Sequence, residues 1–127
     1  MGTPTVKFLL DSVILIDHFN GIPAASAYLV QVRSEAAISV ITRAEVLTGF
    51  QQEHLPTARR FLEAFVTLAI DKETADSAAL LRRENGWKLP DAFQAALALQ
   101  HGLKLVTRNS KDFLPERHDF VHIPYRL

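Results

Sequence analysis

The sequence predicts an α/β fold in which a mostly parallel sheet of four to five strands is covered by helices on both faces. Short apolar segments alternate along the chain with segments of helical period, and this alternation is typical of parallel sheets. The length of 127 residues suits one compact domain over residues 1–127. No repeat, linker or low-complexity segment interrupts the pattern, so we expect one folding unit.

The expected strands are short apolar runs that end at polar residues. They cover residues 6–10, 36–40, 67–70, 104–106 and 121–123. The first ends at Asp11 and the third at Asp71, while the fourth leads into a polar loop over 107–112. The last is short and is expected at an edge of the sheet. Strands joined by helices in this way predict parallel pairing.

The expected helices are bounded by residues that start or stop helices. They cover residues 12–19, 24–33, 42–52, 56–65, 72–85 and 90–101. The first ends at the Asn-Gly-Ile-Pro turn over 20–23. We expect the third to begin at Thr42 and the fourth at Pro56.

The last two helices have the clearest signals. Asp71 can cap the first of them, and Gly86 follows its last residue. Pro90 suits the first turn of the second, and Gly102 follows its end. Residues 92–99 of that helix are almost wholly apolar, so we expect it to be buried against the sheet and a partner.

Composition limits the function without defining it. There are 14 basic and 14 acidic residues, so the chain lacks the excess of positive charge that often indicates a nucleic-acid-binding protein. Zero net charge favours a partner or an oligomer. The absence of cysteine excludes disulfides and thiolate zinc sites. No apolar run approaches the roughly 20 residues of a membrane span, and the start Met1–Lys7 lacks a signal-peptide pattern, so we expect a cytoplasmic protein.

Four acidic residues lie where expected strands give way to loops or helices. Asp11 follows the first strand, Glu45 lies in the first turn of the expected helix after the second strand, Asp91 lies in the first turn of the last helix, and Asp112 lies in the loop after the fourth strand. In a parallel sheet these positions can converge at one edge. Carboxylates are the ligands that Mg²⁺ and Mn²⁺ prefer, and a bound cation relieves their mutual repulsion. Such a site can activate water to cleave a phosphodiester.

Each acid also has a purely structural interpretation. Thr42 and Glu45 fit a capping box, Asp91 can complement the helix dipole, and Asp112 can be a turn residue. Asp11 carries the strongest functional signal, because a carboxylate at the end of a buried strand is costly unless it is compensated.

Other polar residues are interpreted as surface or capping residues. These are Asp17, Asp71, Glu73, Asp76 and Glu84. Arg43, Arg82, Arg108 and Lys111 are candidates for contacts with an RNA backbone. The histidines lack metal-ligand spacing, and no Gly-rich phosphate-binding loop is present.

Four segments together resemble the acidic motifs of PIN domains. They are residues 8–17, 39–47, 89–98 and 105–113. The most specific part is Thr-Arg-Asn-x-x-Asp-Phe over 107–113, which is frequent in the VapC group of toxins. The segment Ile-Pro-Tyr over 123–125 is also similar to that group. Many relatives carry Asn two residues after the first acid, where this chain has Val13.

The resemblance implies a three-layer α/β/α fold and a Mg²⁺- or Mn²⁺-dependent endoribonuclease. The acids Asp11, Glu45, Asp91 and Asp112 would be catalytic, with Asp11, Asp91 and Asp112 as metal ligands. Ser12, Thr107 and Asn109 would support them. The resemblance further implies a homodimer and a cognate antitoxin that inhibits the enzyme in a toxin–antitoxin complex.

Three other functions compete with this hypothesis. One is a phospho-receiver module, which matches the order of acids poorly. Another is a catalytically weak or inactive PIN scaffold that binds RNA or protein, which Val13 favours and the retention of the acids disfavours. The third is a DNA-flap nuclease, for whose extra helical segments 127 residues leave little room.

Overall fold

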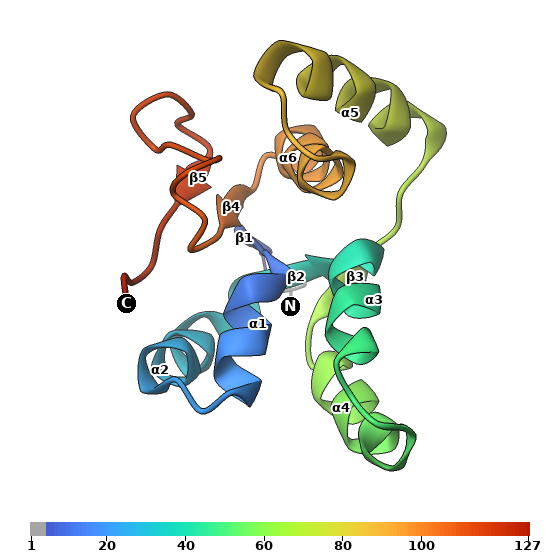
Figure 1. The fold of residues 1–127 in the computed structure, drawn as a ribbon, viewed down its shortest axis with the longest axis vertical. Helices are drawn as coiled ribbons and strands as arrows, with labels where there is room; N and C mark the ends of the chain where they lie inside the picture. Colours follow the sequence, from blue (N-terminus) through green and yellow to red (C-terminus); the bar gives the residue numbers. More distant parts are fainter. Residues whose placement is uncertain (1–4) are drawn as a thin grey trace.

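The computed structural model describes residues 5–127, and a five-stranded parallel sheet lies between two layers of helices in it (Figure 1). The strands are β1 (Phe8–Leu10), β2 (Ala36–Ser39), β3 (Val66–Leu68), β4 (Lys104–Val106) and β5 (Val121–His122). The helices are α1 (Ser12–Phe19), α2 (Pro23–Val32), α3 (Val40–Thr48), α4 (Leu55–Leu62), α5 (Lys72–Asn85) and α6 (Leu89–His101). Short 3-10 turns cover Arg33–Glu35 and Gln52–His54. The expected α/β fold with a parallel sheet is confirmed.

The first four residues, on which the signal-peptide prediction partly rests, lie outside the described residues.

Alternation along the buried strands assigns side chains to the two helical layers. Leu10, Ile38 and Val106 belong to the core that includes residues of α1, α2, α3 and α4. Their neighbours Leu9, Ala37 and Leu105 belong to the core on the opposite face, formed with α6. Figure 1 shows α5 and α6 on one side of the sheet and α1 to α4 on the other. Because side chains alternate with a period of two, each buried strand supplies both cores.

The strand order β3-β2-β1-β4-β5 places β1 at the centre of the sheet. The chain moves outward from β1 to β2 and β3, and then returns to the other side of β1 for β4 and β5. At such a reversal the loops after neighbouring strands run in opposite directions and leave a crevice beyond the carboxyl ends. The order also differs from the 2-1-3-4-5 order of receiver-type folds, which removes the receiver hypothesis.

The expected ends of the last two helices are confirmed. The Thr74 backbone N–H donates to Asp71 Oδ1 at 2.8 Å, so Asp71 caps α5. Gly86 and Gly102 end α5 and α6 with φ of 71° and 66°, a conformation that costs other residues more. Pro90 lies in the first turn of α6. These ends place Asp91 at the start of a helix whose buried face contacts the sheet.

The expected start of α3 is wrong. The helix begins at Val40 rather than Thr42, and Ser39 is its N-cap, with Ser39 Oγ accepting from the Thr42 backbone N–H at 3.0 Å. Glu45 therefore lies in the second turn rather than the first, and the capping-box interpretation fails. The expected helix over 56–65 also shifts, because α4 begins at Leu55, with Pro56 next, and ends at Leu62.

Among the described residues, no helix combines the length and the apolar character that crossing a membrane requires.

We predict that Ser39→Ala lowers the free energy of unfolding by about 1–2 kcal/mol, because it removes a buried cap from α3. Glu45→Ala is the matched control and should not lower it, since Glu45 has no capping role here. Urea denaturation of both variants measures this difference. A loss of stability in Glu45→Ala equal to that in Ser39→Ala would restore the capping box.

Candidate active site

Asp11 lies buried at the carboxyl end of β1, where it is also the N-cap of α1. Its backbone N–H donates to the Val106 carbonyl at 2.8 Å and so extends the pairing of β1 with β4. Its Oδ1 accepts from the Ser12 backbone N–H at 2.8 Å, and its Oδ2 accepts from Thr107 Oγ1 at 2.7 Å. Both carboxylate oxygens are therefore held by the start of a helix and the end of a neighbouring strand.

The environment of Asp11 makes its ionisation costly. Burial raises the pKa of the Asp11 carboxyl, and hydrogen bonds from Thr107, Ser12 and Gln94 lower it only in part. The balance leaves the pKa above its usual value. A carboxylate that is desolvated and only partly compensated gains from a nearby cation.

The turn after β4 holds a second acid. The Asn109 backbone N–H donates to Thr107 Oγ1 at 3.0 Å, so Thr107 links this turn to Asp11. The Asn109 side chain then brackets Asp112: its Nδ2 donates to Asp112 Oδ2 at 2.9 Å, and its Oδ1 accepts from the Asp112 backbone N–H at 3.2 Å. Trp87 Nε1 donates to the Asp112 carbonyl at 2.9 Å. Thr107 and Asn109, two of the three residues expected to support the site, thus hold one acid each.

The pKa of Asp91 is affected by the other three acids of the candidate site. Burial and the negative charges of Asp11, Asp112 and Glu45 together raise the pKa of Asp91 to about 6, although the charge of Lys88 acts to lower it. Desolvation and the charge of Asp11 likewise raise the pKa of Glu45, against a hydrogen bond from Ser12. Asp91 therefore responds to the charges of acids that come from three other parts of the chain, up to 80 positions away in sequence in the case of Asp11.

The donor set fits a hard divalent cation, although it does not form a closed coordination shell. Within residues 5–127, no three Asp, Glu or His side chains lie close enough together to hold a metal as they stand. Like-charged carboxylates repel one another until a cation neutralises them, so some separation is expected of this set. The ligands on offer are carboxylate oxygens, the type that Mg²⁺ and Mn²⁺ prefer.

Sequence reasoning missed Gln94. This residue lies one turn after Asp91 on α6 and is 1% exposed. Its Nε2 donates to Thr42 Oγ1 at 2.5 Å, and Thr42 Oγ1 donates to the Leu10 carbonyl at 3.3 Å, while Gln94 Oε1 has no hydrogen-bond partner. Gln94 thus joins α6 to α3 and β1 beside Asp11. The signal was its position as the one polar residue within the apolar segment 92–99.

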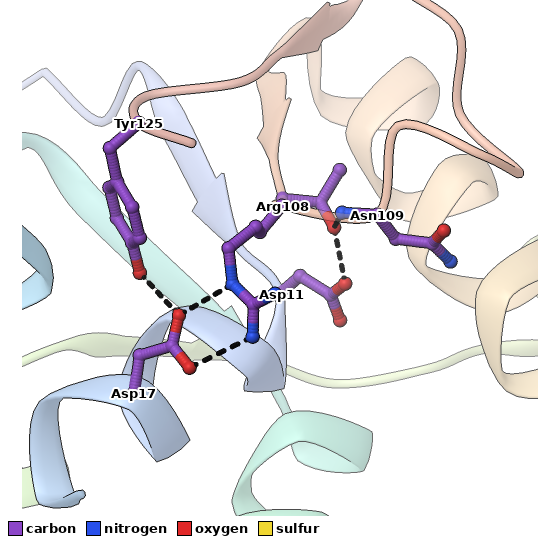
Figure 2. Close-up of polar contacts among 6 residues, drawn as sticks. Asp11, Asp17, Arg108, Asn109 and Tyr125 are labelled. Atoms are coloured by element: carbon purple, nitrogen blue, oxygen red, sulfur yellow. Dashed lines mark hydrogen bonds and ion pairs between the residues drawn. The ribbon is translucent and has the colours of Figure 1, made fainter. Parts of the chain in front are cut away.

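The assignment of Asp17 to a helix surface is wrong. Its side chain is 5% exposed and accepts hydrogen bonds from Arg108 and Tyr125 (Figure 2). The signal was an acid directly after the apolar run 13–16 of α1. The other four residues of that group are exposed, as expected.

The basic candidates for RNA contacts differ in their surroundings. Arg43 Nη1 lies 3.3 Å from Glu63 Oε1, and Arg82 Nη1 donates to the Trp87 carbonyl at 3.1 Å. Arg108 pairs with Asp17. Lys111 is exposed in the turn beside Asp112 and lines an open hollow together with Val13, Asn109 and Ser110. RNA binding by these residues stays a prediction, and Lys111 has the most favourable position.

We predict that Asp91→Asn stabilises the metal-free protein at pH 8, because it removes a negative charge that is partly desolvated and repelled by the other acids. The gain in the free energy of unfolding should be about 1 kcal/mol, since solvent screens part of the repulsion at this partly exposed carboxylate. The folded-state pKa is raised to about 6 from 3.8, so ionised Asp91 destabilises the fold and stability falls as pH rises through this range. The gain should therefore disappear below pH 4. Thermal melts across pH measure it. Equal stability of both proteins at pH 8 would contradict the coupling of the acids.

Comparison with known proteins places this geometry in a family. The family model described as PIN domain matches residues 8–115. Ribonuclease VapC10 of Mycobacterium tuberculosis is 34% identical over 108 residues, which cover 80% of this chain and 81% of that protein. Ribonuclease VapC19 of the same organism is 29% identical over 113 residues, covering 83% of this chain and 90% of that protein.

Solved structures agree in fold. A toxin–antitoxin complex from Klebsiella pneumoniae contains a chain with 38% identity and a TM-score of 0.88, covering 95% of this chain and 100% of that one. The DNA-bound VapBC of Salmonella typhimurium has a TM-score of 0.77 at 23% identity, covering 96% and 98% of the two chains, which is a likeness of fold alone. Because the family model spans most of the sequence and includes all four acids, the chain belongs to the PIN-domain family.

Proposed function

We propose that this protein is a Mg²⁺- or Mn²⁺-dependent endoribonuclease and the toxin of a toxin–antitoxin pair. The observation that carries the proposal is the buried Asp11 carboxylate at the carboxyl end of β1, together with Asp91, whose pKa is raised by the charges of Asp11, Asp112 and Glu45. Similar proteins are named ribonucleases, and a similar solved chain comes from a toxin–antitoxin complex, which supports both parts of the proposal.

Asp11, Asp91 and Asp112 would hold the cation, and Glu45 would remain free for proton transfer. When bound, the cation supplies a Lewis acid that makes an attacking water more acidic and stabilises negative charge on the phosphodiester. Glu45 lies on the exposed side of α3 with a raised pKa, which suits a carboxylate that accepts a proton from that water.

The supporting residues keep the acids in place during this chemistry. Thr107 donates to Asp11 Oδ2, and Ser12 donates to Oδ1, so both oxygens keep a defined direction. Asn109 performs the same task for Asp112 through its side-chain amide. The hydrogen bonds to Asp11 favour its charged form, which is the form that binds a cation.

The RNA backbone would lie across the open hollow beside Asp112, where Lys111 can neutralise a phosphate. Val13 lines the same hollow and contributes an apolar surface where many relatives offer an amide. We expect this difference to affect how RNA is oriented rather than how the cation is held, because Val13 has no polar atom in its side chain.

The antitoxin and a second copy of the chain are the proposed protein partners. A hollow of about 230 Å³ lined by Ile16, Phe19, Val46 and Phe50 also includes Glu45, so an apolar antitoxin segment bound there would lie beside the acids. Leu80 and Leu99 are 59% and 50% exposed beside a separate hollow between α5 and α6, which favours a homodimer through that face. A cytoplasmic location remains a prediction.

We predict that antitoxin-free protein cleaves RNA from a pool of structured transcripts in Mg²⁺ or Mn²⁺, and that EDTA abolishes cleavage. Asp11→Asn should reduce the rate by at least about 100-fold, because it removes a charged ligand at the site. Asp76→Asn is the matched control, since it removes an exposed acid of α5 and should cleave at the normal rate. The assay follows cleavage of labelled RNA by gel electrophoresis.

Two results would contradict the proposal. Cleavage that survives EDTA and Asp11→Asn would place the activity elsewhere or in a contaminant. Folded, Mn²⁺-binding protein that cleaves no RNA in the pool, and leaves cellular RNA intact when expressed, would favour the inactive PIN scaffold.

A further inference from the structure

A second buried acid lies near the site and is not used by the proposed chemistry. Asp17 lies on α1 and is 5% exposed, a position where an unpaired carboxylate would be costly. Its Oδ2 accepts from Arg108 Nε at 2.7 Å and from Tyr125 Oη at 2.8 Å, and its Oδ1 accepts from Arg108 Nη2 at 3.0 Å. The pairing with Arg108 is therefore bidentate, with the tyrosine as a third donor (Figure 2).

The energetics favour a permanent ion pair. Burial acts to raise the pKa of Asp17, but the hydrogen bonds from Arg108 and Tyr125 and the charge of Arg108 outweigh it, so the pKa is lowered. The hydrogen bond to Asp17 in turn raises the pKa of Arg108. Breaking one partner would leave a buried charge without compensation, which is strongly unfavourable.

The three residues come from three separate parts of the chain. Asp17 belongs to α1, Arg108 to the turn after β4, and Tyr125 to the C-terminal segment after β5. Arg108 lies between Thr107 and Asn109, whose side chains hold Asp11 and Asp112. Figure 2 shows the Arg108 side chain extending to Asp17. The hydroxyl of the preceding residue, Thr107, donates to Asp11. The ion pair with Asp17 thus restrains Arg108, which lies between Thr107 and Asn109, the residues that hold Asp11 and Asp112.

We propose that Asp17, Arg108 and Tyr125 form a positioning unit that fixes the turn over 107–109 and, through it, Asp11 and Asp112 in the arrangement that binds the cation. This inference rests on the proposed metal-dependent function. It assigns Arg108 a role different from the expected contact with RNA, because two of its guanidinium nitrogens are already bound to Asp17. It also makes the C-terminal segment part of the site's support through Tyr125.

The test measures Mn²⁺ affinity by electron paramagnetic resonance of the free ion, separately from RNA cleavage. Asp17→Asn should weaken Mn²⁺ binding by about 10-fold, the lower end of the effect of removing a group hydrogen-bonded to a metal ligand, because Asp17 acts on the ligands through Arg108. Tyr125→Phe should weaken it less, because the bidentate ion pair remains. Glu35→Gln is the matched control, since it breaks the exposed 2.8 Å pair of Lys7 and Glu35 before β1 and β2 and should leave Mn²⁺ affinity unchanged.

Hydrogen exchange shows whether an effect on Mn²⁺ binding comes from positioning or from unfolding. In Asp17→Asn and Tyr125→Phe, amides over 107–112 should exchange faster while those of β1 and β2 stay protected. A double-mutant cycle of Asp17→Asn and Tyr125→Phe on Mn²⁺ affinity should be non-additive, because both act through one carboxylate. For RNA cleavage, kcat should fall with little change in KM.

The outcomes separate this inference from the proposed function. Unchanged Mn²⁺ affinity and unchanged exchange over 107–112 in both variants would overturn the positioning unit. An unchanged Mn²⁺ affinity together with a raised KM for RNA in Arg108→Lys would also overturn the positioning unit, because it would indicate that Arg108 contacts RNA instead. Weakened Mn²⁺ binding in Asp17→Asn of a protein that cleaves no RNA would support the unit and reject the nuclease.

Discussion

Asp11 places a carboxylate where the fold excludes water, at the end of the central strand, and a group of this kind is unfavourable unless hydrogen bonds compensate it. Here the compensation comes from the start of α1 through Ser12 and from the end of β4 through Thr107. The pairing of β1 with β4 and the start of the first helix at residue 12 are therefore tied to the same side chain. The remaining cost of ionising Asp11 appears as its raised pKa, and a cation bound as proposed would reduce it.

Two polar networks flank this carboxylate. On one side, Gln94 and Thr42 connect α6 to α3 and to the backbone of β1. On the other side, Arg108 connects the turn after β4 to α1 and the C-terminal segment. The first network is buried and the second is partly buried, in surroundings where hydrogen bonds are stronger than in water and unsatisfied groups are costly. The acids are thus carried by elements whose relative positions the surrounding structure restrains, as the proposed cation site would require.

Local patterns were informative where a residue's role depends on its neighbours in sequence. The cap at Asp71 and the stops at Gly86 and Gly102 are of this kind, and all three are confirmed. The start of α3 was misplaced, because Val40 was assigned to the strand, whereas Ser39 both ends the strand and caps the helix that begins at Val40. Asp17 was assigned to a surface, because the partners that make its burial favourable lie 91 and 108 residues away in sequence.

The sequence by itself determined the α/β class, the family resemblance and the identity of the four acids, because each depends on local periodicity or on short motifs. Only the tertiary structure decided the strand order and thereby which loops share the crevice, since local patterns do not specify which strand lies beside which. It also decided that Asp91 responds to the charges of Asp11, Asp112 and Glu45, and that Arg108 is paired with Asp17. Electrostatic coupling and ion pairing depend on distances in space, which folding sets by burying both faces of the sheet.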